Sequence, residues 1–143
     1  MEIIETEPEK KIKLSKIEFS CDDVDNTIPL PLPQQLNFFM LIAGKPASGK
    51  TSLILNLICK KNKVYNKKFD RIYVFSPSLI TLKDDPFGDL PEEQKFTELT
   101  SQDLEQVLLD IKDSGEKILF IMDDVVNDMK KNGVLTLLNK MLM

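Results

Sequence analysis

Eight consecutive residues, 44–51, have the types and spacing of a loop that binds phosphate groups. Their sequence is Gly-Lys-Pro-Ala-Ser-Gly-Lys-Thr, which fits the pattern G-x-x-x-x-G-K-[ST]. Gly44 and Gly49 can adopt backbone angles that turn successive amide N–H groups inward around an anion. The charge of Lys50 suits the β- and γ-phosphates, and the Thr51 hydroxyl suits Mg²⁺. The spacing therefore predicts a loop that binds ATP with Mg²⁺.

The predicted nucleotide-binding residues continue from this loop into the helix that follows it. Lys45, Ala47 and Ser48 contribute mainly backbone amides, whereas Pro46 has no N–H and stiffens the turn. The free N–H groups at the start of the helix add the positive end of its dipole. The full predicted set is Gly44, Lys45, Pro46, Ala47, Ser48, Gly49, Lys50, Thr51 and Ser52.

Two adjacent carboxylates, Asp123 and Asp124, follow directly on an apolar run at 117–122. Ligands of open α/β sheets lie at the carboxyl ends of the strands, so Asp123 is expected beside the phosphate loop. There it would hold Mg²⁺ with Thr51, usually through a water molecule. Asp124 could accept a proton from the attacking water or orient it. We predict Lys50 and Asp124 as catalytic residues, and Thr51 and Asp123 as metal ligands.

Strands and helices alternate around these residues. Apolar runs predict strands at 36–43, 71–75 and 117–122, a short strand at 95–99, and helices at 52–60, from Thr100 and at 133–143. Thr100 suits a helix N-cap with Asp103 three residues later, and Gly115 would close that helix. Its apolar residues follow the spacing of a core-facing stripe, at Leu104, Val107, Leu108 and Ile111. The alternation predicts an α/β fold, with a mostly parallel sheet covered on both faces.

The chain divides into a lead-in at 1–33 and an ATPase domain at 34–143. Alternating prolines near the end of the lead-in block helix and predict an extended segment, while 12–19 could add an edge strand. Within the domain, 84–91 is rich in turn residues. Asn127 and Asp128 follow the paired carboxylates in a predicted loop, where a turn role is favoured over orienting water.

Positive charge is concentrated in one part of the sequence. Between residues 44 and 83, nine lysines or arginines face a single acid, Asp70, which leaves about eight positive charges in a chain whose net charge is −4. Such a block could contact a polyanion. A solvated lysine-rich loop is the favoured interpretation, because no aromatic residues are interleaved for base stacking.

Composition excludes several classes of protein. The 143 residues suit one domain, and no stretch of about 20 apolar residues or secretory signal is present. Cys21 and Cys59 are too far apart to indicate a disulfide framework or a metal cluster, which suggests a reducing compartment. The absence of histidine excludes histidine-based catalysis. We therefore expect a cytoplasmic protein with no membrane segment.

Three segments carry a resemblance to a known family. Residues 44–51, 71–77 and 120–125 resemble the poxvirus-type genome-packaging ATPases of large DNA viruses, within the FtsK/HerA group of P-loop motors. The resemblance covers about 34–143. It implies a P-loop NTPase three-layer sandwich, a Mg²⁺-dependent ATPase that translocates double-stranded DNA, and a homo-oligomeric ring in the host cytoplasm or virion. It also implies that Asp124 activates the attacking water.

Members of this group continue past the paired aspartates with a further helix and with a strand that ends in a polar sensor residue. That strand would lie between the phosphate-loop strand and the strand ending at Asp123. The resemblance therefore implies that the C-terminal part of the domain is missing, which would leave a gap in the sheet. Arg71 is the only arginine and precedes a strand, so no arginine finger is evident.

Two other interpretations of the phosphate loop remain open. A small P-loop kinase of a nucleoside or metabolite would suit a short chain, although such enzymes usually carry several arginines in a lid. A nucleotide-binding fragment that does not hydrolyse ATP would show the same loop. Phosphate transfer to an acceptor would indicate the first, and binding without phosphate release the second.

Overall fold

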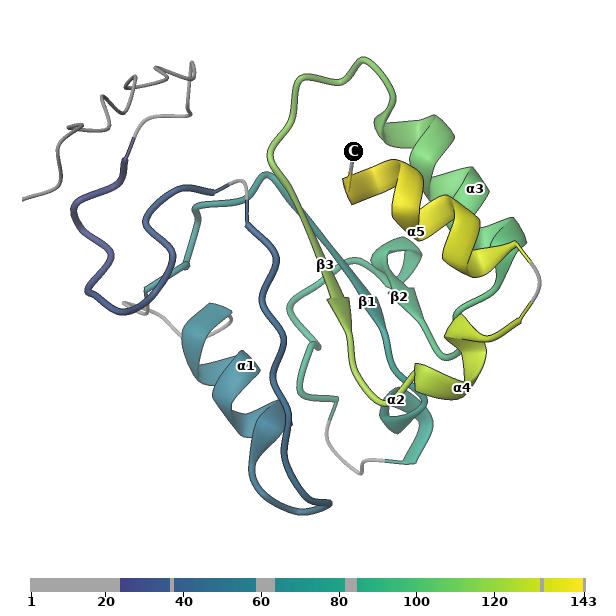
Figure 1. Cartoon of the computed structure of the whole chain (residues 1–143), viewed down its shortest axis with the longest axis horizontal. Coiled ribbons are helices and arrows are strands. Elements are labelled where there is room, and N and C mark those ends of the chain that lie inside the picture. Colours follow the sequence, from purple (N-terminus) through teal and green to yellow (C-terminus); the bar gives the residue numbers. More distant parts are fainter. Residues whose placement is uncertain (1–23, 37, 59–63, 82–84, 132, 143) are drawn as a thin grey trace, which may run out of the picture.

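The computed structural model describes residues 24–36, 38–58, 64–81, 85–131 and 133–142 (Figure 1). Its elements in chain order are α1 (Lys50–Ile58), β1 (Arg71–Phe75), α2 (Ser78–Thr81), the 3-10 helix η1 (Glu92–Gln94), β2 (Lys95–Phe96), α3 (Ser101–Ile111), β3 (Ile118–Met122), α4 (Val126–Met129) and α5 (Val134–Leu142). No helix within these ranges is long and apolar enough to cross a bilayer. The predicted edge strand at 12–19 lies outside the described residues.

The sheet is parallel throughout, with β1 in the middle. Its strand order is β2-β1-β3, and β1 pairs with β3 in a register that matches Arg71 with Ile118 and Phe75 with Met122. The prediction of strands at 71–75 and 117–122 is confirmed, and the short strand predicted at 95–99 is limited to its first two residues. Helices on both faces complete an α/β fold, as the alternation predicted.

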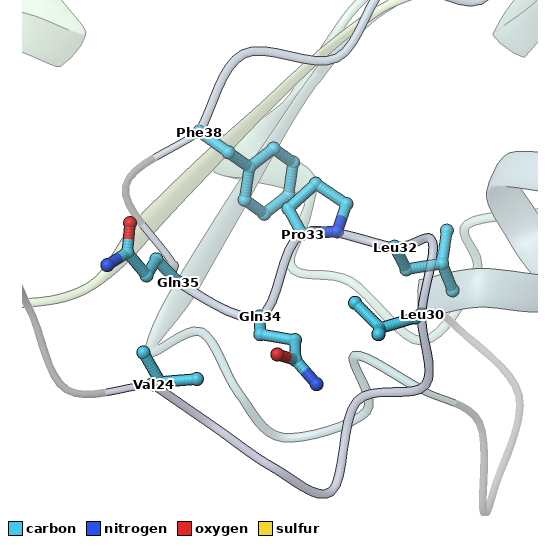
Figure 2. Close-up of a pocket in the computed structure, with 7 residues that line it drawn as sticks. All are labelled: Val24, Leu30, Leu32, Pro33, Gln34, Gln35 and Phe38. Carbon is cyan, nitrogen blue, oxygen red and sulfur yellow. The ribbon is translucent and has the colours of Figure 1, made fainter. Parts of the chain in front are cut away.

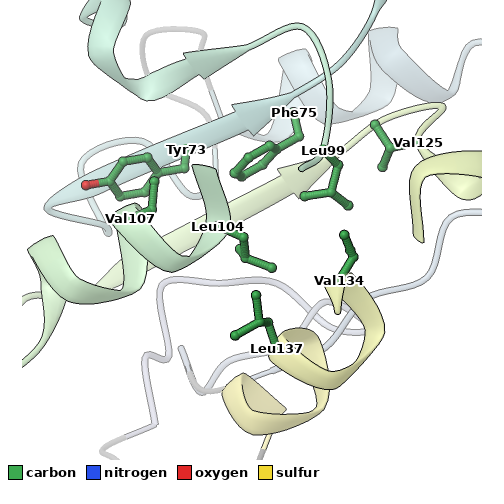
Figure 3. Packing of buried hydrophobic residues seen from close by; sticks show 8 residues of the cluster. All are labelled: Tyr73, Phe75, Leu99, Leu104, Val107, Val125, Val134 and Leu137. Carbon is green, nitrogen blue, oxygen red and sulfur yellow. The ribbon is translucent and has the colours of Figure 1, made fainter. Parts of the chain in front are cut away.

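The face covered by α3 and α5 holds the main hydrophobic core (Figure 3). Aromatic rings of all three strands stack across it, with Phe75 4.8 Å from Phe96 and Tyr73 5.6 Å from Phe120 between ring centroids. The predicted stripe of α3 packs here, because residues three and four apart share one side of a helix. The cluster of buried residues comprises Tyr73, Phe75, Leu99, Leu104, Val107, Val125, Val134 and Leu137.

Both ends of α3 can be compared with their predictions. The Thr100 hydroxyl accepts the amide of Asp103 at 3.1 Å, so the predicted N-cap is confirmed. The prediction that Gly115 closes the helix is wrong, because α3 ends at Ile111 with Lys112 as its C-cap. The first left-handed residue past the helix is Asp113, at φ 60°, which shows that an aspartate can fill the position expected for glycine.

The opposite face of the sheet, covered by α1, is packed less deeply. Its buried cluster consists of Val74, Ile121 and Phe87, and the α1 residues that pack against it are only partly buried. No residue of α1 is fully buried. The predicted helix at 52–60 is confirmed as far as Ile58 and begins earlier, at Lys50; residues 59–60 lie outside the described part of the chain.

The prediction of a buried strand at 36–43 is wrong for the residues that the structure describes. Segment 38–43 has no strand conformation, and Phe39 and Leu41 are 73% and 79% exposed. A parallel strand requires backbone hydrogen bonds from a neighbour, and β3 borders the described sheet with β1 as its only partner there. The apolar sequence of 38–43 therefore lacks the pairing that would make it a strand.

Residues 24–33, the described part of the lead-in, form turns and fold back on the domain instead of extending away. Asp25 forms an ion pair with Lys68, and the Tyr65 hydroxyl donates to the carbonyl of Pro33 at 2.8 Å. Ile28 is fully buried. The alternating prolines blocked helix as predicted, but they did not keep the segment extended, because Ile28 gains burial by folding back.

Candidate functional site

The two predicted metal ligands lie in contact although they are 72 positions apart in sequence. The Thr51 hydroxyl, in the first turn of α1, donates to Oδ2 of Asp123 at 2.8 Å. Asp123 is buried, and its amide donates to the carbonyl of Phe75 at 3.0 Å, which continues the pairing of β3 with β1. The predicted phosphate loop, residues 44–51, and the carboxyl ends of β1 and β3 lie at the same end of the molecule (Figure 1).

The loop before α1 wraps around the lysine that follows it. Lys50 Nζ donates to the carbonyls of Gly44 and Lys45, both at 3.0 Å. Ala47 has φ 61° and Gly49 has φ 86°, so the chain twice enters the left-handed region. A Cβ on Gly44 would lie 2.6 Å from Ser48 Oγ. The positive φ of Gly49 favours glycine there, whereas a side chain at Gly44 would displace the Ser48 hydroxyl.

Asp124 stands next to this contact in an unusual backbone conformation. Its φ is 57°, in the left-handed region that aspartate and asparagine enter more readily than other side chains with a Cβ. The residue is exposed, and no hydrogen bond or ion pair joins its side chain to another described residue. The carboxylate is thus available to a ligand, and such backbone conformations cluster at functional sites.

Ser76 is a polar residue at this end of the sheet that the sequence prediction missed. It directly follows β1, is 1% exposed, and occupies the position next to Asp123 in the β1–β3 register. A polar residue directly after the second strand was the available signal, because parallel strands bring their carboxyl ends to one edge.

The side chains at this site offer oxygen ligands of the kind that Mg²⁺ prefers, but they do not complete its coordination shell. Thr51 and Asp123 offer hydroxyl and carboxylate oxygens at hydrogen-bond distance from each other. No group of three or more acidic, cysteine or histidine side chains that could hold a metal occurs among the described residues. Mg²⁺ usually takes one or two protein ligands and completes its shell with water and substrate phosphates. The pair therefore suits Mg²⁺ that arrives with a nucleotide.

Asn127 and Asp128 lie in the short helix α4, so the prediction that they occupy a loop is wrong. Asp128 accepts the amide of Leu99 at 3.2 Å and pairs with Lys131 at 2.8 Å. The hydrogen bond from Lys131 lowers the pKa of the Asp128 carboxyl. Asp128 therefore joins α4 to the residue before the N-cap of α3 and does not belong to the candidate site.

Part of the positively charged block is neutralised within the molecule. Lys68 pairs with Asp25, and Arg71 Nε lies 2.8 Å from a carboxylate oxygen of Glu116. Asp25 and Glu116 both lie outside residues 44–83, the range that defines the block. Several members of the block, Lys60, Lys61, Lys63 and Lys83, fall outside the described residues. Within the described part, ion pairing supports the interpretation of this block as a solvated, partly neutralised surface.

A separate pocket of about 280 Å³ lies between the folded-back lead-in and the residues that directly follow it (Figure 2). Its lining is mostly apolar, with two amide side chains, and comprises Val24, Leu30, Leu32, Pro33, Gln34, Gln35 and Phe38. None of these residues belongs to the phosphate loop or to the strand ends. The pocket is therefore distinct from the candidate nucleotide site.

Comparisons with known proteins returned no match of any of the three kinds sought: no family profile, no curated protein and no solved structure is significantly similar to this chain. A functional proposal for this chain therefore rests on the geometry of its own residues.

Proposed function

We propose that this chain binds Mg·ATP and hydrolyses it, as part of a P-loop NTPase domain. The observation that supports this most strongly is the 2.8 Å hydrogen bond between Thr51 and Asp123. A separate sequence pattern contains each of these residues, and both patterns predict a ligand of the same magnesium ion. Two patterns that matched by chance would not be expected to place their residues in contact in the fold.

Each residue has a distinct role in this proposal. Amides of the phosphate loop and the charge of Lys50 bind the β- and γ-phosphates. Thr51 and Asp123 hold Mg²⁺, which when bound neutralises charge on the phosphates. Asp124 accepts a proton from the water that attacks the γ-phosphorus. The bond between that phosphorus and the bridging oxygen breaks, so ADP and inorganic phosphate are the products.

We further propose that hydrolysis serves a DNA-translocating motor, and that the motor packages a viral genome in the host cytoplasm or virion. This step rests on the resemblance carried by 44–51, 71–77 and 120–125. Double-stranded DNA would be the translocated polymer, and a homo-oligomeric ring would be the working form. A small P-loop kinase gains no support from the described structure, since an arginine-rich lid cannot be built from one arginine.

The test combines nucleotide binding with turnover. Mg·ATP at 100 times its dissociation constant should stabilise the wild-type protein by about 2.7 kcal/mol, and Lys50→Ala should abolish that stabilisation. Phosphate release that rises when double-stranded DNA is added would support the motor. Turnover indifferent to DNA would contradict the motor alone. Stabilisation without phosphate release would assign a nucleotide-binding chain that does not hydrolyse ATP, and no stabilisation would overturn the whole proposal.

A further inference from the structure

Ser76 carries a buried hydroxyl whose hydrogen-bonding capacity is only half used. Its oxygen accepts the amide of Ser78 at 3.2 Å, and its own amide donates to the carbonyl of Phe96 at 2.8 Å. No acceptor for the hydroxyl hydrogen occurs among the described residues. The residue is 1% exposed. A buried hydroxyl hydrogen without an acceptor is unfavourable, so a bound partner that accepted it would stabilise the site.

The direction of this side chain follows from the alternation of β1. Val74 and Ile72 pack in the cluster that faces α1, and side chains two residues apart in a strand share a face. Ser76 follows Val74 by two, so it lies on the α1 face. Asp123 follows Ile121 by two and is on the same face, as its bond to Thr51 shows. Ser76 and Asp123 are thus neighbouring positions on adjacent strands, on the face that α1 covers.

We propose that Ser76 is a positioning residue, whose hydroxyl donates to the water held beside Asp123 when a magnesium nucleotide is bound. The inference rests on the proposed function. Mg²⁺ keeps several waters when proteins bind it, and an aspartate commonly holds the ion through one of them. Residues outside the first shell orient ligands of the ion, and their loss weakens its binding. Ser76 supplies the donor that such a water needs, from the strand next to Asp123.

The experiment compares the binding of ADP with and without Mg²⁺, using a fluorescent ADP and excess chelator for the metal-free arm. Ser76→Ala should weaken Mg·ADP binding by about 5- to 10-fold, in line with the loss of one hydrogen bond between neutral groups. Metal-free ADP binding should stay within about 2-fold. Ser76→Cys keeps the volume but donates weakly, so it should show the same selective loss if the alanine variant folds poorly. Ser101→Ala, at the start of α3 on the other face, should change neither affinity.

Each other outcome has one meaning. Equal losses with and without Mg²⁺ would show that Ser76 only maintains the turn to Ser78, and the inference would be overturned. Unchanged affinities in both variants would overturn it as well. In either case, a wild-type protein that binds Mg·ADP would leave the proposed function intact. A wild-type protein that binds no magnesium nucleotide would overturn both the inference and the proposed function.

Discussion

The two faces of the sheet differ in how much they bury. On the face under α3 and α5, three strands contribute stacked rings, and the helices insert fully buried side chains such as Leu104 and Val134. On the face under α1, the buried cluster has three members and the helix contributes only partly buried ones. Yet the α1 face carries Thr51, Asp123 and Ser76. Stability and the proposed chemistry therefore lie on opposite sides of the same strands.

This separation follows from the alternation of side chains along β1 and β3. Tyr73 and Phe75 point to the core, while Val74 packs toward α1 and Ser76 follows it by two positions. A polar residue at the end of a strand leaves apolar packing on the other face untouched. Substitutions should thus separate into those that affect function and those that affect folding, and four predictions test how far that holds.

The largest expected effect is on turnover, at the carboxyl end of β3 beside Asp123. Asp124→Asn should lower ATP turnover by roughly 10²–10⁴-fold, because asparagine cannot accept the proton of the attacking water. Asparagine tolerates the left-handed backbone at φ 57° almost as well as aspartate. The free energy of unfolding should therefore change by less than about 0.5 kcal/mol. Phosphate release and urea unfolding measure the two quantities on one sample.

Asp128→Asn is the matched control, since Asp128 bonds to Leu99 and Lys131 away from the candidate site. It should lower stability without the loss of turnover. If Asp128→Asn reduced turnover as strongly as Asp124→Asn, the carboxylate of Asp124 would have no special part in the reaction, and the functional separation of the two faces would fail.

The sequence predicted one face of the sheet better than the other. The strands at 71–75 and 117–122, the N-cap at Thr100 and the stripe of α3 depend on local spacing, and all are present. The described residues of 36–43 form no strand, because strand formation depends on a neighbour as well as on an apolar sequence. A local sequence pattern contains no information on whether a neighbouring strand is present.

The candidate site shows the same limit. Thr51 and Asp123 could be named because each belongs to a short pattern with a chemical reason. Ser76 lies within 71–77, a segment that carries the resemblance, but no chemical role follows from that segment, and only the register of β1 with β3 brings it next to Asp123. Likewise, the lead-in was expected to extend, since its prolines were visible in the sequence but the burial of Ile28 was not.

The next largest effect concerns folding, and it compares leucines on the two faces. Leu104 in α3 is fully buried, whereas Leu55 in α1 is partly buried against the smaller cluster. Leu104→Ala should lower the free energy of unfolding by about 3 kcal/mol, because it leaves a cavity. Leu55→Ala should cost about 1 kcal/mol, since part of the side chain is already in water. Equal losses in urea unfolding would show that the two faces contribute alike to stability.

A smaller effect is expected at the helix ends. Thr100→Ala removes the side chain that accepts the amide of Asp103, and should cost about 1 kcal/mol. Ser52→Ala, at an exposed position in the first turn of α1, should cost less than about 0.5 kcal/mol. Denaturant unfolding of both variants compares the start of α3, which a side chain caps, with the start of α1, which is proposed to bind phosphate. A larger loss at Ser52 would reverse the comparison.

The smallest effect is a pH-dependent change in melting temperature. It concerns the contacts between the lead-in and the segment that follows α1. Tyr65 donates its amide to Leu57 near the end of α1, and the folded lead-in packs on Tyr65 and pairs Asp25 with Lys68. The hydrogen bond from Lys68 lowers the pKa of Asp25 from 3.8 to about 2. A carboxyl with a lowered pKa stabilises the fold at pH above the pKa it has in the unfolded chain. It loses that contribution as pH falls through the pKa it has in the folded protein.

The melting temperature of wild type should therefore exceed that of Asp25→Asn at pH 5, and the gap should close toward pH 2. Lys68→Gln should remove the same pH-dependent gap. A gap that stayed constant from pH 5 to pH 2 would mean that the ion pair does not hold the lead-in against this side of the domain.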